Sequence, residues 1–270
     1  GSSINEVSRD ARRAYAFIES TSQALLEEQD EVWTSDLGAG TVCFNPASSI
    51  RSGVVEVEGR PVWISDVPAL GAAVVSGSAP APVTIDGLSL RNGRLEATLD
   101  AAGNVAHLAA DGASGSVNRS DQPLGQLVVY DDHPRRWEAW DIDADYVETA
   151  RPVDGAAQIE ILEEGPLRAI IEFRRELGEA SRIIQRYVLA AGSPRLDVQY
   201  RVEWQEDRRL LRVLCPTDIR TRRGTVGIQF GVQERPTHRN TSWEQARFEF
   251  PGHRFMDLSE PGRGLAVLDN

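Results

Sequence analysis

The beginning of the chain has its apolar residues at helical spacing. They recur mostly at steps of three and four residues, or at multiples of these, which places them on one side of a helix. The members of this stripe are Ile4, Val7, Ala11, Ala14, Ile18, Leu25 and Val32. Ser3 and Glu6 have the spacing of a capping box, so the pattern predicts a short amino-terminal helix. The stripe needs a cover, from this chain, from neighbouring segments that this sequence lacks, or from a second copy in a homo-oligomer.

After Gly38 the apolar residues follow a period of two. The clearest case is RLDVQYRVEW, residues 195–204, in which apolar and polar side chains alternate. Its apolar side is formed by Leu196, Val198, Tyr200, Val202 and Trp204. Strict alternation is typical of a strand with one face on a core and one face in water, so this segment predicts a half-buried antiparallel strand.

Further strands alternate with turn signals along the rest of the chain. A turn at Gly192, Ser193 and Pro194 joins two long strands, and Asn92-Gly93 predicts a tight hairpin. The other strand candidates are VVEVEG, GQLVVY, AQIEILEEG, LRAIIEFRRE, LLRVLCP and TVGIQFGVQ. Many strands separated by Gly/Pro turns, without a second helical pattern, predict a mainly β fold, an antiparallel β-sandwich preceded by the helix.

The same patterns divide the chain into three parts. We expect the helix in residues 1–37, a small β segment with a linker in residues 38–83, and a large β-sandwich domain in residues 84–270. The linker is placed at GAAVVSGSAPAPV, residues 71–83, because small residues and prolines of this kind are typical of a connection between two β portions.

The charge of the chain limits the classes of partner that it can bind. It has 41 acidic and 29 basic residues, all of the basic ones Arg, for a formal net charge of -12. Nucleic acids and anionic membranes require clustered positive charge, so we expect neither, whereas a neutral, hydroxyl-rich ligand is compatible. The sequence has no apolar run of about 18 residues and no basic-then-apolar leader. We therefore expect no membrane span and a cytoplasmic location.

The cysteines and histidines lack the spacings of metal sites. Cys43 and Cys215 each lie in an apolar, strand-like run, and we expect both to be buried free thiols. His238 and His253 have the chemistry of ligands or acid–base groups, but neither belongs to a His-x-His, HExxH or Cys/His pattern. We expect these two residues alone to bind no metal.

A first candidate binding segment is DDHPRRWEAWDID, residues 131–143. It mixes carboxylates, among them Asp141 and Asp143, with Trp137 and Trp140. Sugars have C–H faces that stack on indoles and hydroxyls that pair with carboxylates, so the segment suits a glycan. The alternative is that both Trp fill the core while the acids remain in solvent.

A second candidate is the polar segment 234–264, which has no sustained period. It holds His238, Arg239 and Asn240, whose side chains can contact a ligand. The alternative is that the short polar side chains here, Asn240 among them, satisfy local backbone groups of a loop.

The order of segments resembles the C-terminal β region of glycoside hydrolase family 38 α-mannosidases, most closely the bacterial and vacuolar type. The resemblance runs from about Gly40 to the end. The segments that carry it include VCFNP, LRNGRLEATLDAAGNV, WEAWDID, EEGPLRAIIEFRRELGEASRIIQRYVLAAGSPRLDVQYRVEW, RRLLRVLCPTDIR and ERPTHRNTSWEQARFEFPGHRFMDLSEPG. It implies a mutarotase-like supersandwich, with the helix as the end of an inter-domain helical bundle and with further strands after Asn270.

The resemblance also implies where the chemistry lies. The family hydrolyses α-mannosides with retention, using an Asp nucleophile and a Zn²⁺ held partly by a His-x-Asp motif, all in an upstream α/β-barrel. None of His107, His133, His238 and His253 is followed by x-Asp. We therefore expect no catalytic residue, cofactor or metal ligand in this chain. As a hypothesis, the residues that face the substrate are Trp137, Trp140, Asp141, Asp143, His238, Arg239 and Asn240.

Three functions remain open. The first is the C-terminal domain of an α-mannosidase, which supports and partly lines the active site of the upstream barrel. The second is an autonomous carbohydrate-binding module with Trp137 and Trp140 as its sugar platform. The third is an aldose-epimerase-like enzyme, because a mutarotase needs only a His acid and a Glu base. The first is preferred because a long ordered string supports it.

Overall fold

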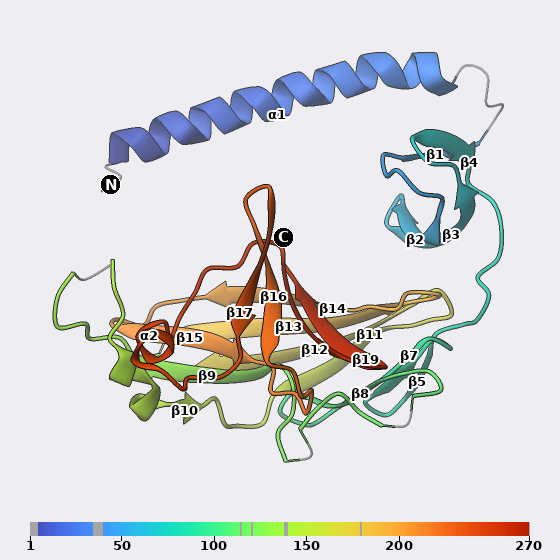
Figure 1. Cartoon of the computed structure of the whole chain (residues 1–270). Coiled ribbons are helices and arrows are strands. Elements are labelled where there is room, and N and C mark those ends of the chain that lie inside the picture. The colour runs from blue at the N-terminus through green and yellow to red at the C-terminus, as the bar shows by residue number, and fades with distance from the viewer. Residues whose placement is uncertain are drawn as a thin grey trace. The chain divides into compact units, whose positions relative to one another are not determined.

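The computed structural model describes residues 5–34, 40–113, 115–119, 121–137, 140–178 and 180–269. The chain forms two compact units, Gly1–Ala79 and Pro80–Asn270 (Figure 1). Most of the elements are strands, and they form several antiparallel sheets. The predicted mainly β, sandwich-type fold is therefore confirmed.

The amino-terminal helix is α1, Asn5–Thr34, and its 30 residues exceed the short helix expected. The stripe residues Val7, Ala11 and Ile18 are all exposed, while Ile4, Ser3 and the side chain of Val32 lie outside the described part. Among the described residues, no helix has both the length and the apolar character needed to cross a bilayer.

The β part of the first unit consists of two small antiparallel pairs. Its strands are β1 (Val42–Asn45), β2 (Arg51–Val57), β3 (Arg60–Val67) and β4 (Gly71–Val74). β1 pairs with β4 and β2 with β3. The buried Asn45 side chain joins them, because its Nδ2 donates to the carbonyls of Ser49, Val67 and Pro68 at 2.8, 3.1 and 3.0 Å.

The longest strands of the second unit form one antiparallel sheet in the order β11-β12-β13-β14. Their bounds are Gln158–Glu164, Arg168–Leu177, Ser181–Ala190 and Leu196–Glu203. β13 and β14 are the two long strands predicted around Gly192, and they pair from Leu189↔Leu196 to Arg182↔Glu203. Alternate residues of β12 and β13 form the buried inner face, with Ile171 opposite Tyr187.

Two smaller sheets supply the second layer. One has the order β5-β6-β7-β8 and contains the hairpin predicted at Asn92-Gly93, and the other has the order β10-β9-β15. The first four strands are Thr84–Asp86, Ser89–Arg91, Leu95–Leu99 and Val105–Ala110. β9 is Gln126–Asp131, β10 is Arg151–Pro152 and β15 is Arg209–Leu214, and the 3₁₀ helix η1, Ala144–Thr149, lies between β9 and β10.

The layers meet through close contacts of the large sheet with the β7–β8 turn. The Tyr187 hydroxyl donates to the Gly103 carbonyl at 2.7 Å. Gly103 has a φ of 68°, and a Cβ there would lie 2.9 Å from the Phe173 ring, so both the backbone and the packing require glycine. Phe173 and Tyr187 are fully buried and pack edge to face, with ring centroids 5.9 Å apart.

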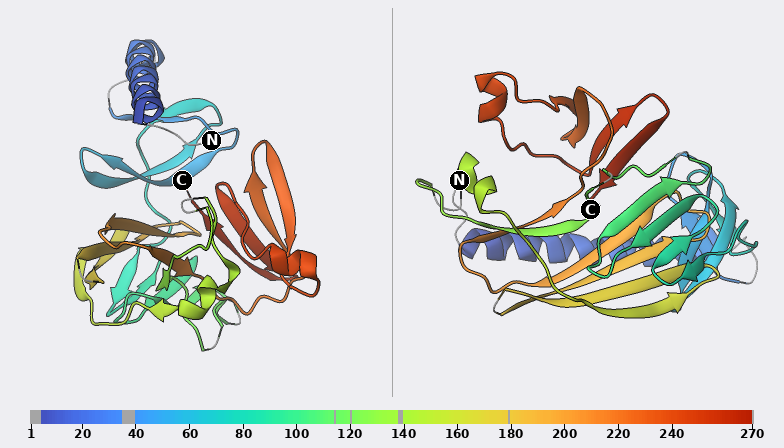
Figure 2. Two further views of the ribbon diagram at one scale, coloured as in Figure 1. Left: turned by 90° about the vertical axis from the view of Figure 1, so that its left-hand side faces the viewer. Right: turned by 90° about the horizontal axis from the view of Figure 1, so that it is seen from below.

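A further antiparallel sheet has the order β17-β16-β18-β19 (Figures 1 and 2). Its strands are β16 (Arg223–Ile228), β17 (Gly231–Pro236), β18 (Phe255–Glu260) and β19 (Arg263–Leu268), and the helix α2 (Ser242–Ala246) follows β17. The prediction of one strand over TVGIQFGVQ is wrong. Ile228 pairs with Gly231, so the chain turns at Gln229 and Phe230 and forms a hairpin.

Two predictions of burial are wrong in part. β14 is the last strand of its sheet, and Tyr200 and Val202 on its expected core face are exposed, whereas Leu196, Val198 and Trp204 of the same face are partly buried. Cys43 and Cys215 are free thiols as expected, but Cys43 is only partly buried and Cys215 is exposed.

Candidate functional site

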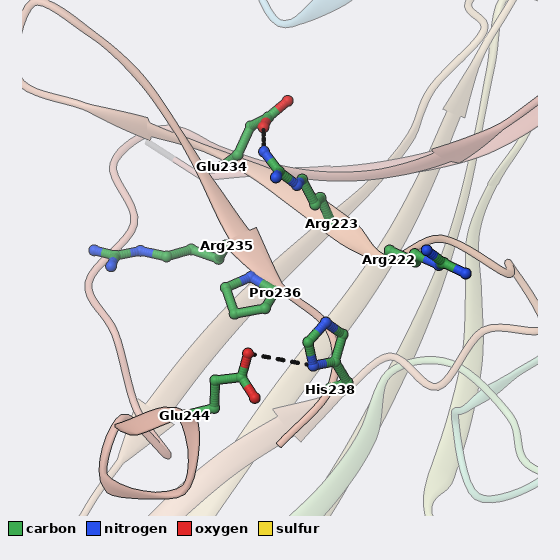
Figure 3. A pocket seen from close by; sticks show the side chains of 7 residues that line it. All are labelled: Arg222, Arg223, Glu234, Arg235, Pro236, His238 and Glu244. Atoms are coloured by element: carbon green, nitrogen blue, oxygen red, sulfur yellow. Dashed lines mark hydrogen bonds and ion pairs between the residues drawn. The ribbon is translucent and has the colours of Figure 1, made fainter. Parts of the chain in front are cut away.

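An open pocket with a volume of about 550 Å³ lies between the β16–β17 hairpin and α2 (Figure 3). It is lined by Arg222, Arg223, Glu234, Arg235, Pro236, His238 and Glu244. The pairing of β16 with β17 sets Arg223 opposite Pro236, so the start of one strand and the end of the other form one wall. His238 and Glu244 come from the segment that follows.

Glu244 positions His238 through a capping box at the start of α2. The Glu244 carboxylate accepts the backbone N–H groups of Asn240 and Thr241 at 2.8 and 2.9 Å, and the Thr241 hydroxyl accepts from the Glu244 N–H at 3.3 Å. The other carboxylate oxygen lies 3.4 Å from Nδ1 of His238 (Figure 3). The imidazole orientation is therefore fixed by the same residue that begins the helix.

The environment of Glu244 favours its ionised form. Desolvation acts to raise its pKa, but the N–H groups of Thr241 and Asn240 and the nearby His238 outweigh this, so the pKa lies below its ordinary value. The described residues offer no hydrogen-bond partner to Nε2 of His238, which is thus available to a ligand hydroxyl.

The arginines of the pocket do not converge on one point. Arg223 forms an ion pair with Glu234, and Arg235 stacks over the Phe250 ring with its Cζ 5.5 Å from the centroid. Arg222 and Arg235 extend to opposite sides (Figure 3). This arrangement suits a neutral polar ligand better than an anion.

Arg239 and Asn240 contribute to the shape of the segment. Arg239 Nη2 donates to the Phe248 carbonyl at 3.2 Å, across the turn of α2, and the Asn240 N–H binds Glu244. Both residues are exposed. As predictions of substrate contact they stay open.

The first candidate segment leaves β9 after Asp131, and its described residues beyond that point lie outside helices and strands. Trp137 and Trp140 are 70% and 64% exposed, so the alternative that both fill the core is wrong. The backbone N–H groups of Trp140 and Asp141 donate to the Trp137 carbonyl at 2.8 and 3.1 Å, and Trp137 has a φ of 63°. At the base of the loop, the Arg135 N–H donates to Asp143 at 2.9 Å.

One cluster of side chains connects the two candidate segments to β15 within unit Pro80–Asn270. Tyr146 of η1 is buried, its ring lies 6.4 Å from that of Phe248, and its hydroxyl donates to Glu249 at 2.5 Å. Arg212 of β15 pairs with the same carboxylate through two contacts, at 2.5 and 3.1 Å. We call Tyr146, Arg212 and Glu249 the clamp. Asp141 and Asp143 precede η1 and His238 precedes Phe248, so the clamp anchors residues that are about 100 positions apart in sequence.

Two residues of this site were missed from the sequence. Trp243 on α2 is 75% exposed, and Glu244 holds His238. The spacing of Thr241 and Glu244 is itself a capping-box signal that predicts the helix and the place of the carboxylate. No pattern indicates that the Trp243 ring is exposed.

The described residues do not fit a metal ion. No group of three His, Cys, Asp or Glu side chains comes together anywhere in the described ranges. A zinc site needs at least three such ligands.

Comparison with known proteins identifies the family. Residues 90–270 match the model of the glycosyl hydrolases family 38 C-terminal domain. The chain belongs to this family. The predicted resemblance to family 38 is thereby confirmed.

Relatives in this family agree with the match. The chain is 40% identical over 185 residues, 68% of its length, to alpha-mannosidase 2C1 of Homo sapiens. It is 35% identical over 185 residues, 66% of its length, to alpha-mannosidase G of Dictyostelium discoideum. The chain spans 18% and 16% of these relatives, so it corresponds to a minor part of each.

A solved family 38 structure shares the fold. The alpha-mannosidase from Enterococcus faecalis V583 superposes with a TM-score of 0.59 at 12% identity, over 86% of this chain and 31% of that chain. At this identity the likeness concerns the fold alone.

Proposed function

We propose that this chain is the C-terminal domain of a retaining α-mannosidase that acts on α-mannoside glycans. The observation that carries the proposal is the 40% identity over 185 residues to a protein named alpha-mannosidase. The parent enzyme would carry its nucleophile and its zinc in an α/β-barrel domain upstream of this chain, and that domain would be the main partner of the β-sandwich. A cytoplasmic location belongs to the same proposal.

Within the parent enzyme, the His238 pocket and the Trp137–Trp140 loop would face the substrate. The support is chemical. The His238–Glu244 pair presents an imidazole nitrogen to a hydroxyl-bearing ligand, with Glu244 holding the ring in place. Asp141 directly follows the exposed Trp140 in the chain, and Asp143 follows two residues later, so the segment combines apolar ring faces with hydrogen-bonding acids, as a sugar ligand requires.

An epimerase is less well supported. A mutarotase places its acid and its base on either side of the ligand, whereas His238 and Glu244 contact each other at 3.4 Å. This geometry suits a single imidazole oriented by a carboxylate rather than an acid and a base on opposite sides of a ligand.

The test uses the full-length polypeptide encoded by the gene. Its upstream reading frame should contain a barrel-length segment with a His-x-Asp motif, and the enzyme should hydrolyse an aryl α-mannoside. His238→Ala should lower kcat/KM by about tenfold, which corresponds to the loss of one hydrogen bond to the substrate. Gln229→Ala, on the hairpin turn outside the pocket lining, is the control. An upstream frame without such a segment, together with no mannoside turnover, would refute the proposal.

A further inference from the structure

The large sheet of the second unit ends in two strands of different character. In the order β11-β12-β13-β14, the strands β11 and β14 each pair on one side only among the described strands. The N–H and C=O groups on the other side of such an edge can pair with a further strand, so proteins commonly protect edges with charges or bulges. β11 is protected in both ways. Its pairing with β12 shifts register between Ile161 and Glu163, and it carries Glu160, Glu163 and Glu164.

β14 has no bulge and no run of like charges. It pairs with β13 over its whole length without a register shift. Every residue of Gln199–Glu203 is exposed, so both faces of this part of the strand are open to solvent. Tyr200 and Val202 are 38% and 39% exposed, although they lie on the face that carries the core in β12 and β13. A regular edge strand with exposed apolar side chains is a template for pairing with another strand.

The charges of β14 are complementary to those of a second β14 across a two-fold axis. In an antiparallel pair of identical strands with Gln199 opposite Gln199, each residue faces the one that lies equally far from Gln199 on the other side. Asp197 then lies opposite Arg201 of the second copy. Arg195, which directly precedes β14, lies opposite Glu203. Both are pairs of opposite charge, and the symmetry forms each of them twice.

The apolar side chains follow the same register. Val198 lies opposite Tyr200 of the second copy, and Leu196 lies opposite Val202. Leu196 and Val198 are partly buried, so the more exposed half of each strand meets the less exposed half of the other. Apolar cross-strand pairs stabilise a sheet, and the large sheets of the two copies would continue as one.

Neighbouring registers are disfavoured by charge. Side chains alternate between the faces of a sheet, so the two apolar sides stay together only when like-facing residues lie opposite each other. Moving the axis from Gln199 by one residue toward the amino terminus places Arg195 opposite Arg201. Moving it by one residue toward the carboxyl terminus places Asp197 opposite Glu203. Like charges directly opposite each other destabilise a pair of strands, so Gln199 is the favoured centre.

Arg201 lacks a partner that a second copy would supply. Its side chain is exposed, and it forms no ion pair with any residue that the structure describes. Asp197 binds Arg195 of the same copy at 2.5 Å, so its carboxylate is already ordered at the edge. Asp197 and Arg201 are four residues apart on one strand, about 13 Å, which is too far for an ion pair within one copy. Pairing of two strands brings them together.

We propose that two copies of this chain associate through β14, antiparallel and centred on Gln199, so that their large sheets join into one. We call this contact the β14 interface. The partner is a second copy because both the charges and the apolar side chains of the edge are complementary to themselves. The proposal concerns assembly and does not rest on the proposed function.

The first test is a cross-link at the two-fold axis. In a chain whose own thiols are removed by Cys43→Ser and Cys215→Ser, Gln199→Cys places two thiols on Cα atoms about 4.5–5.5 Å apart, within the range of a disulfide. Oxidation with copper phenanthroline in air should convert most of this variant to a covalent dimer. Glu164→Cys, on β11 at the other edge of the sheet, is the matched control and should stay monomeric. No cross-link at Gln199→Cys, or equal cross-linking at both positions, overturns the β14 interface.

The second test exchanges the charges. The dissociation constant of the dimer is measured by sedimentation in chains that carry Ile18→Arg, so that apolar contacts through α1 do not contribute. Arg201→Asp should weaken the dimer at least about tenfold, because it sets two carboxylates opposite each other at two symmetric places. Adding Asp197→Arg should restore the dissociation constant to within about threefold of the starting value, because opposite charges meet again. A double variant as weak as Arg201→Asp alone overturns the β14 interface.

Hydrogen exchange in the full-length polypeptide encoded by the gene separates a second copy from another segment of the same polypeptide. We expect the β14 amides to exchange slowly only at concentrations at which the protein is dimeric. Slow exchange in a monomer, or a protein that stays monomeric at every concentration, overturns the β14 interface. A full-length protein that hydrolyses no aryl α-mannoside refutes the proposed function, but the β14 interface would still stand.

Discussion

At the scale of single residues, the clamp fixes the ionisation of the groups that it joins. Burial, with the hydrogen bond to Glu249, raises the pKa of Tyr146 to about 12. Desolvation acts to raise the pKa of Glu249, but the hydrogen bonds from Arg212 and Tyr146 outweigh it, and the pKa lies below its ordinary value. The folded clamp therefore prefers a neutral Tyr146 and an ionised Glu249.

A pH dependence of stability follows from these two shifts. The contribution of Glu249 is present above its unfolded pKa of about 4.3 and is lost as the pH falls through the lower, folded value. The contribution of Tyr146 is complete below about pH 10 and is lost as the pH rises toward 12. We expect about 1 kcal/mol or less from Glu249, because solvent screens a partly exposed pair.

The measurement is urea unfolding of the chain between pH 3 and pH 7, monitored for unit Pro80–Asn270. Glu249→Gln should lower the free energy of unfolding at pH 7 and should match the wild type near pH 3. Glu96→Gln, which removes a carboxylate from an ion pair with Arg91 in the β6–β7 hairpin, is the control. An equal difference between Glu249→Gln and wild type at both pH values would contradict the prediction.

The same residues show how much of the site can be predicted from the sequence. Trp137, Trp140 and His238 are identifiable because their chemistry stands out within polar segments. The clamp is not, because Tyr146, Arg212 and Glu249 lie on three separate elements and have ordinary neighbours in the sequence. Contacts between distant segments depend on the packing of η1 against β15, which no local pattern encodes.

At the scale of elements, the long hairpin of β13 and β14 could be predicted, and the hairpin of β16 and β17 could not. The first has a turn marked by Gly192, Ser193 and Pro194. In the second, the turn falls on Gln229 and Phe230, where Phe230 has a φ of 59°. A left-handed turn position usually holds Gly or Asn. Because a phenylalanine occupies it here, the sequence contains no turn signal and resembles one continuous strand.

The backbone conformation at Phe230 is therefore expected to be strained, and a substitution can test this. Its side chain is fully exposed and its φ of 59° disfavours any residue with a Cβ, by roughly 1 kcal/mol. We expect Phe230→Gly to raise the free energy of unfolding by up to about 1 kcal/mol, measured by urea denaturation. Val232→Gly, in β17 of the same hairpin, should lower it by about 0.5–1 kcal/mol. Equal destabilisation by both substitutions would show that the turn is not strained.

At the scale of the whole molecule, α1 presents an apolar stripe to solvent. Val7, Ile18 and Leu25 are 54%, 57% and 56% exposed. Apolar area in water costs roughly 25 cal/mol per Å², so covering the stripe is favourable. We propose that two copies of the chain associate through it.

We therefore expect concentration-dependent self-association in sedimentation velocity. Ile18→Arg should shift the chain toward the monomer, because it places a charge within the stripe. Gln23→Arg, on the opposite side of the helix, adds the same charge without touching the stripe and should leave the association unchanged. A wild-type chain that remains monomeric at every concentration would contradict the proposal.

The catalytic capacity of the chain is also a property of the whole molecule. Retaining hydrolysis of a glycoside needs two carboxyl groups about 5–5.5 Å apart across the scissile bond, a proton donor and stabilisation of an oxocarbenium-like transition state. Two carboxylates of the candidate site are already engaged, since Glu244 caps α2 and Glu249 belongs to the clamp. The described residues also bring no three metal ligands together.

We therefore expect the 270-residue chain, purified alone, to release no product from an aryl α-mannoside, with or without added Zn²⁺. Metal-dependent turnover that survives purification and disappears in His238→Ala or His253→Ala would place the active site in this domain. Full-length enzyme assayed in parallel is the positive control, because it contains the upstream segment that we propose to carry the nucleophile.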